Sequence, residues 1–199
     1  MLVLLASCAP GMKPAPGTQH PVDPGQARSV FDDIEVDPSQ IAELANACRS
    51  GEALAFAFLL AQSPPLQKMN MQPVVRVTDD VSSIETAAAD YADFPLEARD
   101  WNITRRGTER LPSGPEYLIL RAWQTPGREL MLFWFRAIYD NEPVGDAPGT
   151  LLRTVGPQGV LVFETDADGC WRLAKDVRGR AARRAFAGRY RSGWQSVEN

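Results

Sequence analysis

The sequence predicts an α+β fold in which N-terminal helices pack on a curved antiparallel β-meander. Apolar residues recur at helical spacing in the N-terminal half, whereas the C-terminal half contains short apolar runs separated by Gly, Pro and Asp-Gly turns. Helices followed by strands are typical of α+β domains. With 199 residues, 44% of them hydrophobic and 23% charged, the chain has room for one domain with a sizeable core. We expect that domain at residues 30–192, followed by a tail at 193–199.

The N-terminus is a short apolar run that ends at a cysteine. The tetrapeptide Leu5-Ala6-Ser7-Cys8 resembles the lipobox of bacterial lipoproteins, which implies that Cys8 carries palmitate-type acyl chains and that residues 1–7 are the remnant of a signal peptide. Because this run is shorter than a usual signal h-region, we expect the true start upstream of Met1. Ala9 follows the cysteine, and by the same resemblance this favours the outer membrane, facing the periplasm. The alternative is a chance match.

Residues 8–29 are rich in Pro and Gly and show no apolar periodicity. We interpret them as a lipidated linker. Because proline favours extended chain at about 3.1 Å per residue, the linker could hold the domain on the order of 50 Å from the membrane. His20, the only histidine of the chain, lies in this linker, so no catalytic histidine is expected in the domain.

A helix is predicted over residues 37–50. Asp37 is a candidate N-cap, and Pro38 suits the first helical turn. The apolar residues expected to share one face are Ile41, Leu44, Ala45 and Cys48. A second apolar helix covers residues 52–62 and should stop at Ser63-Pro64-Pro65.

A short strand is predicted at residues 73–78, followed by a helix over 82–94. Ser82 and Glu85 form a capping-box pattern before apolar residues at helical spacing. Residues 95–115 show no clear period.

The predicted meander consists of strands at residues 116–123, 129–139, 150–155, 160–165 and 170–177. Turns are expected at Pro126-Gly127, at 156–159 and at Asp168-Gly169. A last helix over 178–191 would place Ala182, Phe186 and Tyr190 on one face, surrounded by arginines. Those arginines either contact anionic lipid or an acidic partner, or form a solvated face.

The stretch Asp168-Gly169-Cys170-Trp171-Arg172-Leu173 resembles the final hairpin of the NTF2-like superfamily. The expected order of helices, short strand, helix and long meander is similar to that family as well. The resemblance implies a cone-shaped fold, which that family uses for enzymes, binding proteins and assembly scaffolds, so it leaves the function open.

The hairpin over residues 116–139 is the candidate ligand site. With a two-residue turn, alternate residues of its strands share a face, one face being mixed and the other purely apolar. The mixed face carries the candidate ligand-binding residues Tyr117, Arg121, Trp123, Trp134 and Arg136. Its rings and charges suit an anionic or aromatic small ligand. The alternative is that arginine stems simply lie over tryptophan on an exposed sheet.

Cys48 and Cys170 remain once Cys8 is lipidated. In an oxidising periplasm they either form a disulfide or stay two separate structural cysteines. A catalytic thiol is disfavoured because the domain has no histidine base.

No motif of a hydrolase, P-loop enzyme, dinucleotide-binding enzyme or metalloprotease occurs in the sequence. We therefore expect a lipid-anchored cell-envelope protein whose domain is non-catalytic and binds a partner protein or envelope polymer. The alternative is an NTF2-like small-ligand binder, and an enzyme that uses carboxylates alone is a distant third. No cofactor, metal or nucleic acid is expected. Asp33, Glu35 and Asp37 have the alternate spacing of a calcium loop but lack its Gly and distal Glu, so they are interpreted as acids that precede a helix.

Overall fold

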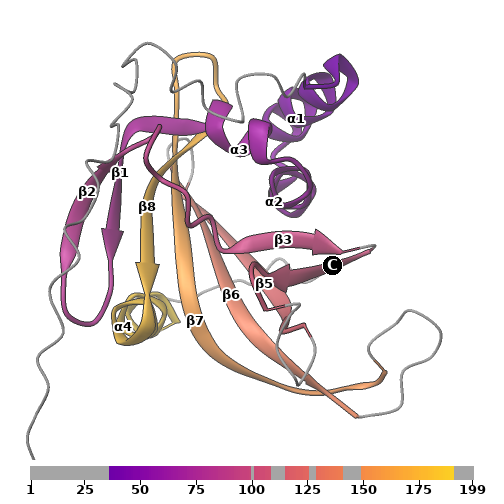
Figure 1. Ribbon diagram of the computed structural model, residues 1–199, viewed down its shortest axis with the longest axis vertical. Coiled ribbons are helices and arrows are strands. Elements are labelled where there is room, and N and C mark those ends of the chain that lie inside the picture. Colours follow the sequence, from indigo (N-terminus) through magenta and orange to yellow (C-terminus); the bar gives the residue numbers. More distant parts are fainter. Residues whose placement is uncertain (1–35, 100, 109–114, 126–128, 141–148, 191–199) are drawn as a thin grey trace, which may run out of the picture. The chain divides into compact units, whose positions relative to one another are not determined.

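A curved sheet of eight strands forms the centre of the computed structural model (Figure 1). The structure describes residues 36–99, 101–108, 115–125, 129–140 and 149–190. The predicted signal remnant, lipidated Cys8, linker and tail all lie outside these residues. The elements are α1 (Pro38–Ser50), α2 (Ala53–Gln62), α3 (Pro64–Met69), β1 (Met71–Thr78), β2 (Ser83–Ala87), β3 (Leu96–Arg99), β4 (Asn102–Arg105), β5 (Tyr117–Thr125), β6 (Glu129–Tyr139), β7 (Leu151–Thr165), β8 (Trp171–Arg178) and α4 (Gly179–Tyr190).

The sheet has the strand order β2-β1-β8-β7-β6-β5-β4-β3. All neighbouring strands are antiparallel except β1 and β8, which run parallel, with Val77 opposite Asp176. The α+β class is therefore confirmed, and the strands of the predicted meander, β5 to β8, are antiparallel to their neighbours in it, but the sheet as a whole is mixed. A parallel pair needs a long crossover connection, and here the whole of the chain between β1 and β8 supplies it.

Helix α1 begins and ends where its caps predict. The Asp37 side chain accepts a hydrogen bond from the Ser39 N–H at 2.8 Å, and Gly51 ends the helix with φ 77°, a conformation that favours glycine. The buried residues are Leu44, Ala47 and Cys48. Ile41, expected on the same face, is 40% exposed, so the helix contacts the core mainly through its second half.

The prolines after α2 begin a new helix instead of only ending the previous one. Ser63 is extended, and its hydroxyl accepts a hydrogen bond from the Leu66 N–H at 3.4 Å. Proline is tolerated in a first helical turn because the N–H it lacks has no intrahelical partner there. Sequence reasoning therefore missed α3.

The helix predicted over residues 82–94 is wrong, because this segment forms β2 and a turn. Asp79 accepts hydrogen bonds from the Val81 and Ser82 N–H groups at 2.8 and 2.7 Å, which makes a tight turn and uses Ser82 there. β2 then pairs with β1, with Ile84 opposite Val77. The apolar residues of the supposed helix face are divided, since Val81 is 95% exposed whereas Tyr91 is buried.

The two strands predicted at residues 150–155 and 160–165 are one continuous strand, β7, and the turn expected between them is wrong. The peptide bond between Gly156 and Pro157 is cis, and Gly156 has φ 139°. The register with β6 shifts at this point, between Trp134 and Arg136. Glycine and proline here form an irregularity inside a strand, which is one of the places where sheets accept both residues.

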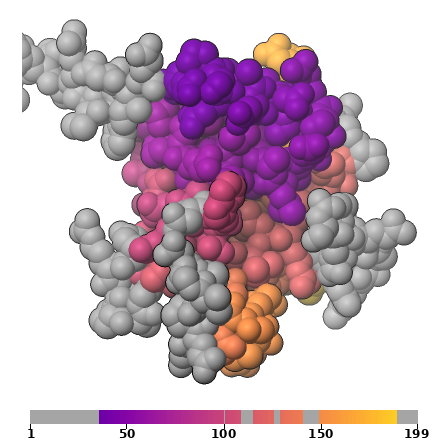
Figure 2. Space-filling view, turned by 90° about the vertical axis from the view of Figure 1, so that its right-hand side faces the viewer, coloured from indigo at the N-terminus to yellow at the C-terminus, as the bar shows by residue number. Residues whose placement is uncertain are grey.

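Helices α1–α3 cover the concave face of the sheet and α4 covers the opposite face (Figure 1). On the concave side Phe56 contacts Phe163, with ring centroids 5.4 Å apart. On the other side Phe186 of α4 contacts Phe133 at 5.3 Å, and Ala182 is buried, as the amphipathic pattern predicted. Figure 2 shows α1–α3, in indigo and violet, over the upper part of one side, with the orange end of β7 at the surface below them.

Candidate functional site

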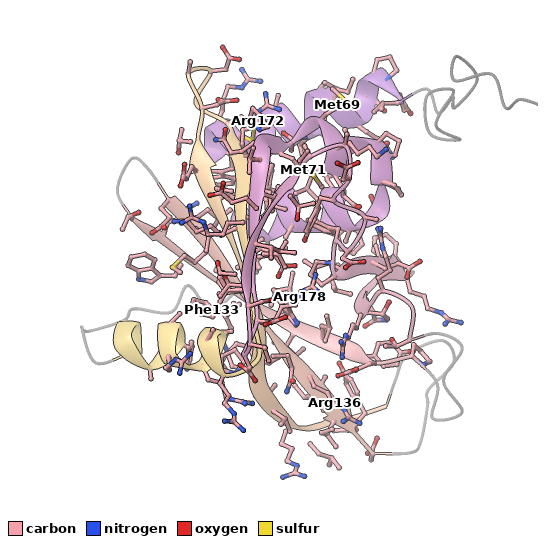
Figure 3. All side chains as sticks on the ribbon, turned by 60° about the vertical axis from the view of Figure 1, so that its left-hand side comes forward. Met69, Met71, Phe133, Arg136, Arg172 and Arg178 are labelled. Atoms are coloured by element: carbon pink, nitrogen blue, oxygen red, sulfur yellow. A yellow bond between two sulfur atoms is a disulfide. The ribbon has the colours of Figure 1, made fainter. Side chains whose placement is uncertain are left out.

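The ligand face predicted on the β5–β6 hairpin is not assembled. Thr125 pairs with Glu129 and Arg121 with Phe133, so three residues, 126–128, connect the strands instead of two. One more residue in the turn shifts the pairing of β5 and β6 by one position. The residues of β6 that share a face with a given residue of β5 therefore change as well. Trp134 and Arg136 consequently lie on the concave face, and the α4 face carries the other three candidates, Tyr117, Arg121 and Trp123. Figure 3 shows Phe133 and Arg136 on opposite sides of the sheet.

Each predicted ligand residue has an intramolecular contact of its own. The Arg121 guanidinium lies 5.1 Å from the centroid of the Phe135 ring, and Tyr117 makes an edge-on contact with Tyr139 at 5.7 Å. Trp123 packs against the α4-side core, and Arg136 lies 3.8 Å from Glu116. An arginine lying over a ring of the sheet agrees with the alternative interpretation, in which no ligand is needed.

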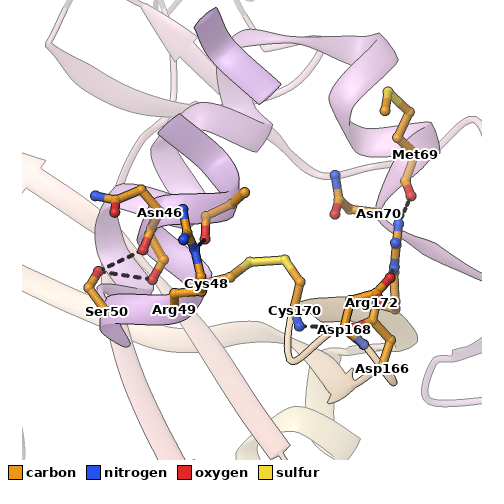
Figure 4. Close-up of a disulfide and its surroundings, with 12 residues drawn as sticks. Asn46, Cys48, Arg49, Ser50, Met69, Asn70, Asp166, Asp168, Cys170 and Arg172 are labelled. Carbon is orange, nitrogen blue, oxygen red and sulfur yellow. Dashed lines mark hydrogen bonds and ion pairs between the residues drawn. A yellow bond between two sulfur atoms is a disulfide. The ribbon is translucent and has the colours of Figure 1, made fainter. Parts of the chain in front are cut away.

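Cys48 and Cys170 form a disulfide, with Cα atoms 5.0 Å apart (Figure 4). It joins the end of α1 to the β7–β8 turn. In that turn Asp166 accepts hydrogen bonds from the Cys170 N–H at 2.9 Å and from Arg172 Nε at 2.7 Å, and Arg172 also donates to the Met69 carbonyl. The bond removes both sulfurs from consideration as nucleophiles or metal ligands.

The concave face holds a pocket of about 410 Å³ where the sheet extends below the helices. Small-molecule sites commonly have volumes of about 300 to 1,000 Å³. The pocket is lined by Ala92, Asp93, Phe94, Pro95, Arg105, Arg106, Trp134, Gln158, Arg178 and Gly179. Of the five residues predicted for ligand binding, Trp134 is the one that lines it.

The floor of the pocket is apolar because a tryptophan lies flat on a glycine. A Cβ atom at Gly159 would come within 1.9 Å of the Trp134 ring, so only glycine at this position of β7 lets the ring lie against the strand. Trp134 is 3% exposed, and Phe94 and Pro95 beside the pocket are also buried. The floor of the pocket thus consists of aromatic and aliphatic carbon.

The walls carry three guanidinium groups and one carboxylate, that of Asp93. Arg105 lies 3.5 Å from Glu116. Arg106 donates to the side-chain oxygen of Gln67 at 3.0 Å, and this amide brings no charge. Because its side-chain partner is uncharged, Arg106 is the lining guanidinium with which an anion can pair.

Arg178 is bound to a completely buried carboxylate. Asp176 is 0% exposed, and its Oδ2 accepts hydrogen bonds from Arg178 Nε and from the Tyr91 hydroxyl, each at 2.9 Å. Arg178 Nη2 donates to the same oxygen and to the Asp93 carbonyl. Burial raises the pKa of Asp176, while Arg178 and the Tyr91 hydroxyl act against this shift. Burial and the Asp176 charge raise the pKa of Tyr91, so Tyr91 stays a neutral donor.

Sequence reasoning missed Asp176, Arg178 and Tyr91. A signal was available in β8, because two charged residues two positions apart on a strand share one face. Their burial could not be read from the strand alone, since it depends on Tyr91, which is 85 residues away in the chain.

The part of the chain that the structure describes contains no group of three or more His, Cys, Asp or Glu residues placed to hold a metal ion. Asp33 and Glu35 of the calcium-loop pattern lie outside it, and Asp37 caps α1. Among these same residues, no helix has the length and apolar character needed to cross a membrane.

A comparison with known proteins found no family model, no curated protein and no solved structure that matches the chain.

Proposed function

We propose that the domain binds a small organic anion in the concave pocket, within a lipid-anchored protein of the cell envelope, and that it acts by binding and not by catalysis. The observation that supports this best is the combination of three arginines with an apolar floor in one pocket of suitable volume. An anion with a planar apolar body matches it, because the charged group can contact guanidinium while the body contacts Trp134, Phe94 and Pro95.

Benzenesulfonate is the probe for this proposal, since it is the anion of a strong acid and keeps its negative charge at every pH used. At ten times its Kd a ligand specific for the folded state adds about 1.4 kcal/mol to the free energy of unfolding, which is expected to raise Tm by about 3 to 6 °C. In Arg106→Gln the rise of Tm on addition of benzenesulfonate should fall by more than half. Among the lining arginines, Arg106 is the one whose side-chain partner, Gln67, is uncharged, so its charge is available to the ligand.

Arg99→Gln is the matched control, because Arg99 is exposed on β3 and does not line the pocket. It should respond to benzenesulfonate as the wild type does. An absence of any shift in the wild type contradicts the proposal, and so does a shift that Arg106→Gln leaves unchanged.

The lipid anchor and the outer-membrane location are a second part of the proposal. They are supported by the tetrapeptide Leu5-Ala6-Ser7-Cys8 and by the Pro/Gly-rich segment after it. The protein expressed from the full gene should partition into the detergent phase, whereas Cys8→Ala should partition into the aqueous phase, because stable anchoring needs more than one acyl chain. His20→Ala, in the same segment, is the control. Equal membrane association of Cys8→Ala and wild type would contradict the anchor.

Kinship with the NTF2-like superfamily also remains a proposal. The final β7–β8 hairpin and helices on the concave face of a curved sheet support it. The helix expected between the first strand and the meander is replaced by β2, so one of the similarities behind the resemblance is missing.

A partner protein of the envelope is the second candidate. The N-terminal end of β7 exposes the aliphatic residues Leu151, Leu152 and Val155, and β8 pairs with β7 only from Gly159 onward. Among the described residues this apolar segment thus has a paired strand on one side only, and such an edge is a surface that an extended peptide of a partner can use.

A further inference from the structure

The buried Asp176 carboxylate has very unequal surroundings at its two oxygen atoms. Oδ2 accepts all the hydrogen bonds described above, from Arg178 and Tyr91. Oδ1 is buried and has no hydrogen-bond partner among the described residues. A buried polar atom without a partner costs free energy, so the ionised carboxylate is only partly stabilised.

Arg178 connects this carboxylate to the pocket. Its side chain is 35% exposed, while that of Asp176 is 0% exposed, and Arg178 itself lines the pocket. An anion in the pocket therefore shares its counter-charge with Asp176. Figure 3 shows Arg178 beside β8, on the side of the sheet opposite Phe133.

The surroundings of Asp176 contain few other charges. Its neighbours in the sheet are the apolar Val77 of β1 and Leu161 of β7. The segment after β2 contributes the neutral hydroxyl of Tyr91 and the negative charge of Asp93, which acts in the same direction as burial. Arg178 is thus the one cation found to act on Asp176 among the described residues.

We propose that an anion bound at Arg178 is accompanied by the uptake of one proton at Asp176. This inference rests on the proposed function. Without a ligand, Arg178 and Asp176 are a neutral pair of one positive and one negative charge. With an anion bound, the ligand becomes the negative partner of Arg178, and protonation of Asp176 keeps the group neutral. The burial of Asp176 favours such a balance, because an ionised carboxylate at this position loses stabilisation when Arg178, its one cationic partner among the described residues, must also compensate the charge of the ligand.

The coupling makes the affinity of the pocket for an anion depend on pH. When one proton is taken up per ligand, affinity rises by up to about tenfold for each pH unit by which the pH falls.

Calorimetry of benzenesulfonate binding, in buffers that differ in their ionisation enthalpy, measures the number of protons taken up. The wild type should take up a proton on binding, approaching one per ligand, and bind more tightly at lower pH. Asp176→Asn should bind with no proton uptake and with an affinity independent of pH. Asp90→Asn is the matched control and should retain the uptake, because Asp90 is exposed and does not line the pocket.

An infrared measurement keeps the test independent of the variant's folding, since the C=O stretch of a newly protonated carboxyl group should appear when the wild type binds benzenesulfonate. Binding without proton uptake, or uptake that persists in Asp176→Asn, overturns this inference and leaves the proposed function intact. An absence of benzenesulfonate binding by the wild type overturns the proposed function and this inference with it.

Discussion

The double variant Cys48→Ala, Cys170→Ala is expected to have a free energy of unfolding about 4 to 5 kcal/mol below that of the oxidised protein. The disulfide spans a sequence separation of 122 residues, and in the chain-entropy model the loss of so long a closed loop frees the unfolded chain considerably. Domains of this size are commonly stable by about 5 to 15 kcal/mol, so the variant should lie close to its unfolding threshold.

The location of the bond adds to this effect. Cys48 is buried at the end of α1, and Cys170 belongs to the turn that precedes β8. The disulfide therefore holds the first helix against the hairpin that brings Asp176 and Arg178 to the pocket. Alanine is preferred to serine as the replacement, because a hydroxyl at the buried position 48 would need a hydrogen-bond partner.

Urea denaturation of the wild type and the double variant, each with and without reductant, measures the loss. Reductant should lower the midpoint of the wild type and leave that of the double variant unchanged, since Cys8 is present in both proteins and only the wild type contains the Cys48–Cys170 bond. Equal midpoints for the oxidised wild type and the double variant would contradict the prediction, and so would alkylation of Cys48 or Cys170 before reduction.

Local signals predicted those elements whose ends are determined locally. The Asp37 cap with Pro38 predicted the start of α1, and the long, almost continuous apolar run of β6 predicted the strand Glu129–Tyr139. The prediction for the segment after β1 was wrong because its apolar residues fit a helix and a strand equally, and pairing with β1 decides in favour of the strand. The turn predicted at Gly156-Pro157 was wrong because this residue pair occurs both in turns and in irregularities within a strand, and the neighbouring strand decides which of them forms.

The candidate site was predictable in its chemistry but not in its residues. Arginine beside tryptophan on one sheet face was expected, and the concave pocket combines both, through Arg178 and Trp134. The expected partners, Arg121 and Arg136, depended on a turn length that Thr125-Pro126-Gly127 does not determine. The residues that line the pocket come from β4 and the residue after it, from β6, β7 and β8, from the first residue of α4 and from the segment at 92–95, and only the register of the whole sheet brings these together.

Arg178→Ala is expected to lower the free energy of unfolding by about 3 kcal/mol at neutral pH, since removal of one partner leaves a buried charge uncompensated. This is the lower end of the usual range for broken buried pairs, because Arg178 is 35% exposed while Asp176 is 0% exposed. In an Asp176→Asn background the same substitution should cost far less, because no charge then needs compensation. Arg180→Ala, on the exposed side of α4, is the control and should stay within about 0.5 kcal/mol of the wild type.

The cost of Arg178→Ala should also depend on pH, with a sign that follows from the raised pKa of Asp176. A carboxyl group whose pKa is higher in the folded than in the unfolded state stabilises the fold fully below the unfolded pKa, about 3.9 for Asp, and this contribution is lost as pH rises through the folded pKa. Arg178 lowers that folded pKa, so its removal raises the pKa further and enlarges the loss. The difference in stability between wild type and Arg178→Ala, measured by urea denaturation from pH 4 upward, should therefore grow with pH, and in the Asp176→Asn background it should stay constant. A difference that is independent of pH in both backgrounds would show that Arg178 stabilises the fold by packing and not by compensating the Asp176 charge.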